Sequence, residues 1–245
     1  MVDHSQVTEA EYLAQYNVQD FDVPLCTVDI VPFRFHNHRL QVLTCLRHQH
    51  PEKEQWALPG GFIDISKDND LDAAAQRKLV AKIGTTAPYL EQVQTVGNQQ
   101  RDPRGWSITV MYYALFPGSA VNQSLLPDTR WLNLQGNTIG HPLAFDHNQL
   151  ISLALERLQN KVQYTSLPVY LLPECFTLAD ISDVFLAILG KTPPMRSIRN
   201  RFLNEDLLED TGEKRYGSNR PATLYRLKKT AVAQFYNRLY HTTQP

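Results

Sequence analysis

The sequence predicts an α+β protein whose 245 residues form two domains, residues 1–163 and residues 164–245. Domains of about 100–200 residues are usual, so this length allows one large or two modest domains. Up to residue 163, strand-like and helix-like segments are mixed along the chain. After that point two helical segments precede a hairpin, and the polar stretch at 164–168 separates the two patterns.

Five segments of the first domain have the β-branched and aromatic content of strands. They are residues 26–35, 40–47, 93–97, 106–116 and 127–134. Helical spacing of Leu, Ile and Ala predicts a helix over 71–83, and Gly84 is suited to end it. Asp146 is a suitable N-cap for a helix that runs to residue 162. Residues 1–20 are polar with scattered tyrosines, which predicts a loose arm or a short helix.

The second domain contains clear helix start and stop signals. Thr177 is the expected N-cap of a helix that ends at Gly190. Pro193-Pro194 opens another helix over 195–204, and residues 207–227 predict a hairpin. Helix, helix and hairpin in this order are typical of a winged helix-turn-helix domain.

Charge is unevenly distributed, although the net charge of −1 argues against a general coat for nucleic acid. Residues 166–245 carry eleven Lys and Arg against eight Asp and Glu, a net +3, which leaves −4 for the rest of the chain. The basic residues are concentrated between Lys191 and Lys229. Such asymmetry predicts that the second domain faces nucleic acid.

Membrane and export signals are not evident in the sequence. No apolar run approaches the roughly 20 residues of a membrane span, and the first residues lack the basic-then-apolar order of a secretory signal. Cys26, Cys45 and Cys175 are far apart and form no zinc-type cluster with histidines. We expect free thiols, no membrane contact and a cytoplasmic location.

A motif suited to phosphate follows the second strand. Gly60-Gly61, between a strand and a helix, lets the backbone approach a phosphate closely. The longer pattern formed by residues 58–62 and 71–84 resembles the Nudix box. In order, that box consists of Gly, five residues, Glu, seven residues, Arg-Glu, an apolar residue, any residue, Glu-Glu, any residue and Gly. The resemblance covers residues 20–160 and implies a Nudix-like α/β/α sandwich.

The departures from this box predict that the domain is not an enzyme. Asn69 replaces the first Glu, and the loop before it is two residues longer than in the family. Lys78 replaces the Glu that follows the arginine, and Ala81-Lys82 replaces the Glu-Glu pair. In Nudix enzymes this helix face binds Mg²⁺ through carboxylates. Because two ammonium groups repel Mg²⁺, we predict no catalytic residue, no metal, no cofactor and no appreciable hydrolysis.

Several residues are candidates for binding a nucleotide. Lys78 and Lys82 either pair with a pyrophosphate or are solvated. Residues 98–106 resemble the Arg-Asp-Pro-Arg-Gly loop of ADP-ribose-type Nudix proteins and their regulator relatives. Two arginines in such a loop can present planar forks to a diphosphate. The alternative is that these residues form a charged hairpin loop beside core tryptophans. A tryptophan can stack on adenine. The predicted effector site comprises Trp56, Gly60, Gly61, Lys78, Lys82, Arg101, Asp102, Arg104 and Trp106.

The helix predicted over 195–204 is amphipathic. Met195, Ile198 and Phe202 lie on one side, and Arg and Asn side chains lie opposite. Arg and Asn are suited to guanine and adenine in the major groove, although a solvated helix face is the alternative. A cationic, Gly-rich segment at 212–221 is suited to contact phosphates or a minor groove. The predicted DNA contacts are Arg196, Arg199, Asn200, Arg201, Lys214, Arg215 and Arg220.

The second domain, together with the degenerate Nudix box before it, resembles the Nudix-related transcriptional regulators of NAD metabolism, the NrtR family. The segments that carry this resemblance are residues 176–190, 199–203, 207–212 and 220–225. The resemblance implies homodimers that bind palindromic operators of NAD biosynthesis or salvage genes and leave them when ADP-ribose or a related nucleotide binds. Two alternatives remain: an active ADP-ribose pyrophosphatase with an appended domain, and a module whose winged helix binds a protein partner.

Overall fold

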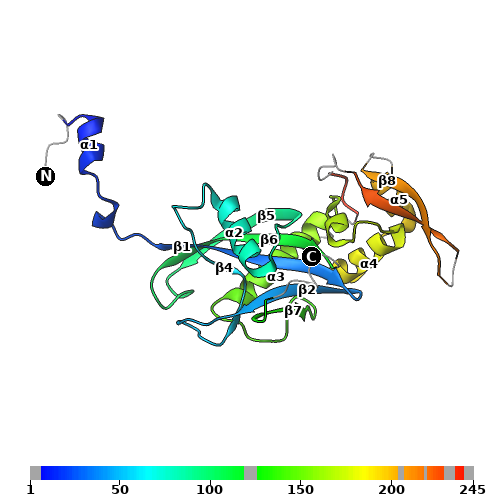
Figure 1. Ribbon diagram of the computed structural model, residues 1–245, viewed down its shortest axis with the longest axis horizontal. Coiled ribbons are helices and arrows are strands. Elements are labelled where there is room, and N and C mark those ends of the chain that lie inside the picture. The colour runs from blue at the N-terminus through cyan, green and yellow to red at the C-terminus, as the bar shows by residue number, and fades with distance from the viewer. Residues whose placement is uncertain (1–6, 119–125, 204–206, 218–219, 229–234, 240–245) are drawn as a thin grey trace, which may run out of the picture.

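A mixed β-sheet forms the centre of the first domain. The computed structural model describes residues 7–118, 126–203, 207–217, 220–228 and 235–239. The sheet order is β3-β2-β1-β6-β5, with β4 paired to β1 and β7 to β2 (Figure 1). The strands are β1 (Leu25–His36), β2 (Arg39–Leu46), β3 (Trp56–Ala57), β4 (Gly60–Phe62), β5 (Tyr89–Asn98), β6 (Ser107–Pro117) and β7 (Thr129–Asn133). The five predicted strands are present, whereas the short β3 and β4 were not predicted.

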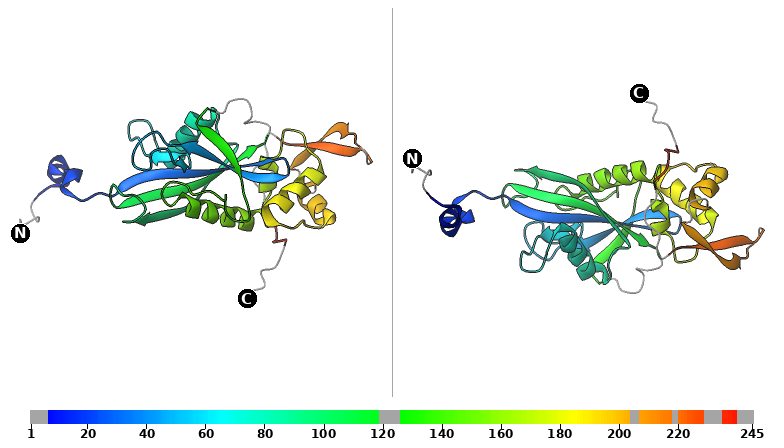
Figure 2. Two further views of the ribbon diagram at one scale, coloured as in Figure 1. Left: turned by 90° about the horizontal axis from the view of Figure 1, so that it is seen from below. Right: turned by 90° about the horizontal axis from the view of Figure 1, so that it is seen from above.

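Two helices cover opposite faces of this sheet. β1 and β6 run parallel at its centre, and their side chains alternate between the faces. Val28 and Ile30 belong to the core under α2 (Leu71–Ile83). Val31 and Phe33 belong to the core that includes α3 (His147–Val162). Figure 2 shows the two helices on opposite sides of the strands, which confirms the predicted α/β/α sandwich.

The second part of the chain has the predicted order of helix, helix and hairpin. Its elements are a 3-10 turn, η3 (Leu167–Leu171), then α4 (Leu178–Leu189), α5 (Met195–Leu203), β8 (Leu208–Arg215) and β9 (Ala222–Leu227). Thr177 caps α4 in a reciprocal capping box with Asp180. Gly190 ends α4 at a positive φ of 68°, a conformation that glycine adopts without strain. A winged helix-turn-helix is therefore present. No described helix is both long and apolar enough to cross a bilayer.

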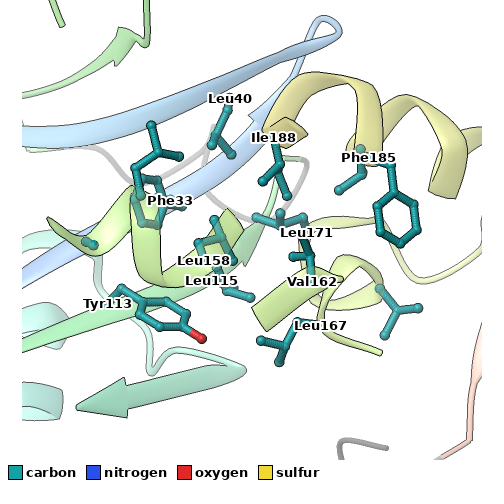
Figure 3. Close-up of a cluster of buried hydrophobic side chains, with 14 of the residues drawn as sticks. Phe33, Leu40, Tyr113, Leu115, Leu158, Val162, Leu167, Leu171, Phe185 and Ile188 are labelled. Carbon is teal, nitrogen blue, oxygen red and sulfur yellow. The ribbon is translucent and has the colours of Figure 1, made fainter. Parts of the chain in front are cut away.

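The two domains share one hydrophobic core. One cluster of buried side chains extends from Phe33 and Tyr113 on the sheet through α3 and η3 to Phe185 of α4 (Figure 3). The same cluster includes Ile198 and Phe202 of α5. Leu167 and Leu171 of η3 are almost completely buried at the centre of this cluster. Phe185 of α4 and Phe202 of α5 contact each other edge to face at a centroid distance of 6.4 Å. The stretch predicted as a boundary is therefore a packed junction and not a solvated linker.

Two local predictions are met only in part. Asp146 precedes α3, as expected, but its side chain makes no capping hydrogen bond; Arg101 holds the carboxylate instead. The predicted loop at 212–221 begins too early. Gly212 occupies an irregularity within the β8–β9 ladder at a φ of 76°, and Lys214 and Arg215 pair with Thr223 and Ala222 inside the hairpin.

The N-terminal residues form an exposed arm. It contains α1 (Glu9–Gln15) and a 3-10 turn, η2 (Val18–Asp20), with no buried residue in either element. Figure 1 shows α1 projecting away from the sheet at the end opposite to the winged helix. The expectation of a short helix in this region is thus met.

The shared core predicts that the domains unfold together. Phe185→Ala removes a fully buried ring from α4 and should destabilise the protein by about 3–5 kcal/mol. All three tryptophans (Trp56, Trp106 and Trp131) belong to the first domain, so their fluorescence reports on that domain alone. Denaturation followed by fluorescence should shift as far as denaturation followed by circular dichroism. Leu186→Ala, at a half-exposed position of the same helix, is the control and should change the stability by less than about 0.5 kcal/mol. An unshifted fluorescence transition in Phe185→Ala would contradict the shared core.

Candidate functional site

A small polar cavity of about 70 Å³ lies where the Gly-Gly segment, the 98–106 loop and the start of α3 meet. Five of the predicted effector residues line it: Gly60, Gly61, Arg101, Asp102 and Arg104. The other lining residues are Thr27, Asp29, Arg47, Leu58, Phe145 and His147. The tertiary structure therefore brings together two motifs that are about 40 residues apart in the sequence.

Gly60 is required by its contact with β1. It pairs with Asp29 in the β1–β4 ladder, and a Cβ at Gly60 would lie 2.1 Å from Asp29 Oδ1 and 2.6 Å from the carbonyl oxygen of Val28. Real Cβ atoms do not approach other atoms so closely, so a larger residue would displace β4. The strand itself thus accounts for the glycine, and the backbone at this point forms one wall of the cavity.

Arg101 is the centre of a buried ionic network. Its Nε and Nη2 donate to the two oxygens of Asp146 at 3.0 and 3.2 Å, and Nη2 also donates to Asp29 Oδ2 at 3.2 Å. The side chains of Arg101 and Asp29 are 5% and 8% exposed, so these are desolvated charges. The network joins the 98–106 loop, β1 and the start of α3 around one guanidinium.

His147 completes the wall on the α3 side. Its Nδ1 accepts a hydrogen bond of 2.9 Å from the backbone N–H of Leu58, beside the Gly-Gly segment. Burial lowers the pKa of His147 below its ordinary value, although Asp29 opposes this shift. The imidazole is therefore neutral near pH 7, consistent with an Nδ1 that accepts.

Arg104 is the most accessible cation of the cavity. Its Nε and Nη2 donate to Asp102 at 3.0 and 2.7 Å, and its guanidinium lies 4.9 Å from the ring centroid of Phe62. The ion pair lowers the pKa of the Asp102 carboxyl, with the hydrogen bonds from Arg104 as the main cause. Because the Arg104 side chain remains 40% exposed, its fork can reach an anion in the cavity.

The two lysines of the box lie beside the cavity. Lys78 Nζ is 3.1 Å from the point where a Cβ on Gly61 would lie, and burial lowers the pKa of this amine. Lys82 lines a second hollow of about 310 Å³ that shares Arg47, Leu58 and Gly60 with the first. Within the described part of the chain, no group of three or more His, Cys, Asp or Glu side chains is arranged to bind a metal. The amines of Lys78 and Lys82 and the methyl group of Ala81 are not oxygen ligands of the kind that Mg²⁺ requires.

Arg77 has a structural contact, in agreement with its absence from the predicted site. Its Nε and Nη2 donate to the two oxygens of Asp68, each at 2.5 Å. These bonds lower the pKa of the Asp68 carboxyl to about 2. The pair attaches the long loop before α2 to the helix itself.

The two predicted tryptophans lie in different places. Trp106 is half-exposed and lines a third hollow of about 680 Å³ with residues 21–25, Arg104 and Gly105. Trp56 lies beneath the guanidinium of Arg130, 3.8 Å from the ring centroid, and packs against the shared core. Trp56 lines none of these three hollows, whereas Trp106 is available to stack on a planar group.

The cationic face of α5 is open to solvent. Arg196, Arg199 and Asn200 are exposed, while Ile198 and Phe202 are buried on the opposite face. Arg199 and Arg220 line a common groove of about 450 Å³ between α5, the start of α4 and β9. Met195 lines this groove and is 40% exposed, unlike Ile198 and Phe202 on the same side of the helix.

Arg201 occupies a different environment from the other predicted DNA contacts. It is 7% exposed, and its guanidinium donates to the backbone oxygens of Gln163 and Asn237 at 3.0 and 2.7 Å. The expectation that Arg201 faces DNA does not match the structure, because its donors are engaged inside the protein. Lys214 is exposed on β8, and Arg215 Nη1 donates to Asp180 at the start of α4 while its side chain stays half-exposed.

Some residues around the cavity were missed at the sequence level. Asp29 is an acidic residue flanked by Val28 and Ile30 in a buried strand, which is a usable signal of a buried polar site. Arg47 follows β2 directly, and its guanidinium lies 4.6 Å from the ring centroid of Phe145. Neither Phe145 nor His147 has a local signal, because only the packing of α3 against the sheet brings them to Gly60.

Comparisons with known proteins agree with this architecture. Residues 25–151 match the family model "NUDIX domain", and residues 168–227 match "NrtR DNA-binding winged helix domain". The chain is 42% identical over 221 residues to the "ADPR responsive transcriptional repressor NtrR" of Acinetobacter baylyi, covering 89% of this chain and 88% of the relative.

Two solved structures are also similar. One is Shewanella oneidensis NrtR complexed with a 27mer DNA, with a TM-score of 0.81, 44% identity, and coverage of 87% of this chain and 98% of that chain. The other is the NUDIX domain of the same NrtR complexed with ADP ribose, with a TM-score of 0.57, 47% identity, and coverage of 62% and 99%. With its Nudix domain, its winged helix and a curated relative matched over nearly its whole length, the chain belongs to the NrtR family of Nudix-related transcriptional regulators.

Proposed function

We propose that the protein is a DNA-binding transcriptional repressor that ADP-ribose, or a related nucleotide, releases from its operator. The observation that carries this proposal is the pairing of two sites in one packed chain. One is a cationic cavity built on a Nudix sheet, and the other is a solvent-exposed cationic helix in a winged helix domain. The Acinetobacter and Shewanella relatives support both halves, since one is named for ADPR response and the other was crystallised with DNA.

DNA contacts in this proposal come from the exposed face of α5 and from the hairpin. Arg196, Arg199 and Asn200 enter the major groove, where Arg and Asn have the donor geometry for guanine and adenine. Lys214, Arg215 and Arg220 approach phosphates from β8 and β9. Arg201 is left out of this set because it is buried.

The nucleotide in this proposal spans the adjoining hollows. The central cavity is far below the roughly 300–1,000 Å³ of a typical ligand pocket, so the diphosphate must displace side chains to enter it. Arg104 and Lys78 supply charge at its rim, and Trp106 in the neighbouring hollow can stack on the adenine. Trp56 is left out because Arg130 and the core already cover it.

Catalysis is not part of the proposed function. Lys78, Ala81 and Lys82 leave the α2 face without the carboxylates that Mg²⁺ needs, and no cofactor is required for binding. The domain therefore binds its nucleotide and does not hydrolyse it.

We also propose that the protein is a homodimer and acts on a palindromic operator in the cytoplasm. The arm at residues 7–24 exposes several large apolar side chains, among them Leu13 and Val23 at 61% and 62%. An isolated helix of seven residues is unstable in water, so α1 needs a covering surface. A second copy of the chain is the occupant that also suits two-fold DNA recognition. The regulated genes in this proposal are those of NAD biosynthesis or salvage.

Arg199→Ala should weaken DNA binding by about 5- to 150-fold, the equivalent of about 1–3 kcal/mol for a bidentate base contact. The measurement is a fluorescence-anisotropy titration with a duplex that the wild-type chain selects from a random pool. Arg39→Ala is the matched control, because it removes the same charge from an exposed position on β2. Equal affinities for Arg199→Ala and Arg39→Ala would remove Arg199 from the interface. If DNA binding did not weaken with rising salt, the proposed role itself would fail.

Arg104→Gln should weaken ADP-ribose binding by about 10- to 150-fold, since a hydrogen bond to a charged group contributes about 1.5–3 kcal/mol. Isothermal titration calorimetry gives the affinity. Arg157→Gln is the control, because Arg157 is similarly exposed and forms a comparable ion pair with Glu91 away from the cavity. Retained ADP-ribose affinity in Arg104→Gln would place the nucleotide elsewhere.

The chain should release no AMP from ADP-ribose in the presence of Mg²⁺. Mass spectrometry after prolonged incubation measures the product, with an active ADP-ribose pyrophosphatase as the positive control. Turnover at an ordinary enzymatic rate, on the order of 1 s⁻¹ or above, would favour the alternative of an enzyme with an appended domain.

A further inference from the structure

Helix α3 connects the cavity to the DNA-binding helix. It has 16 residues and so spans about 24 Å, and one of its sides is buried from His147 to Val162. Its first residue lines the cavity beside Gly60. Its last carbonyl groups face α5, the helix that carries the proposed DNA contacts. A helix is stiff on this length scale, so movement at one end is transmitted to the other.

Arg201 joins the far end of α3 to α5. Its Nη1 donates to the carbonyl oxygens of Val162 and Gln163 at 3.4 and 3.0 Å, which satisfies carbonyls that a helix end leaves without partners. The guanidinium also lies 4.8 Å from the ring centroid of Tyr236. A second link runs from α3 to the end of α4, where Gln159 Nε2 donates to the Ile188 oxygen at 3.0 Å. Both helices of the helix-turn-helix are thus attached to α3.

The near end of α3 is held in an unusual way. Asp146 occupies the N-cap position, where an Asp normally accepts from the free N–H groups of the first turn. Here its backbone is at φ −91° and ψ 15°, not extended, and both carboxylate oxygens accept from Arg101. The carboxylate therefore has two alternative partners, namely Arg101 and the α3 backbone.

We propose that Arg101, Asp146 and Arg201 form a relay in which α3 carries the nucleotide signal to α5, so that Arg201 positions the DNA-binding helix without touching DNA. The proposal rests on the proposed function. A diphosphate that enters the cavity competes with Asp146 for the Arg101 guanidinium. The released Asp146 then caps the first turn of α3, and the resulting shift of the helix reaches α5 through Arg201. Because the two partners of Asp146 exclude each other, the relay has two discrete states.

The test measures coupling separately from binding. The operator duplex selected by the wild-type chain is titrated with and without saturating ADP-ribose, and the ratio of the two DNA affinities is the coupling factor, about 5- to 150-fold for typical allosteric proteins. ADP-ribose affinity is measured independently by calorimetry. In Arg201→Met the coupling factor should fall to within about twofold of one, while the affinity for ADP-ribose stays within about threefold of the wild-type value.

Asp146→Asn tests the near end of the relay and keeps the result interpretable if Arg201→Met fails to fold. Asn retains the ability to cap a helix but loses the ion pair with Arg101. This variant should therefore bind DNA weakly even without ADP-ribose, and adding ADP-ribose should weaken DNA binding little further. Glu156→Gln, an exposed substitution on α3, should retain the wild-type coupling factor. A wild-type coupling factor in folded Arg201→Met or in Asp146→Asn would overturn the relay. Absence of coupling in the wild-type chain would instead overturn the proposed function, and the relay with it.

Discussion

The organisation of this protein depends on one buried guanidinium. Arg101 pairs with Asp29 of β1 and with Asp146 at the start of α3, and all three groups lie largely out of water. Removing one partner of such a network leaves a desolvated charge, which costs about 3–5 kcal/mol. The network therefore fixes the 98–106 loop against the sheet and sets the shape of the cavity. It also keeps Asp146 from the helix N-terminus that it would otherwise cap.

The chemistry of the α2 face follows from a change in the sign of its charge. The scaffold of a Nudix enzyme is retained, including the glycine that contacts β1 and the arginine that anchors the loop through Asp68. The same helix face carries Lys78 and Lys82 one turn apart, together with Ala81. Two ammonium groups attract a diphosphate and repel Mg²⁺, which is the physical basis of the proposed sensor role.

The shared core has consequences for regulation. Two domains joined by a flexible linker would move independently, but here η3 is buried between the sheet and α4. Interfaces with interior-like packing shift between discrete arrangements and do not deform gradually. A small change at the cavity can therefore reach the DNA-binding helix through packed contacts, of which α3 provides the most direct.

The sequence alone determined the elements and their order, because strand alternation, helical spacing and caps are local properties. The helix over 71–83 and the Thr177 cap are found as predicted, and the two lysines and the alanine at 78, 81 and 82 are visible without any coordinates. Only the tertiary structure decided how charged side chains are paired. Asp146 has the local signature of a cap and Arg201 that of a DNA contact, yet each is engaged by a residue at least 35 positions away. Such pairing depends on burial and on distances between elements, which no local pattern contains.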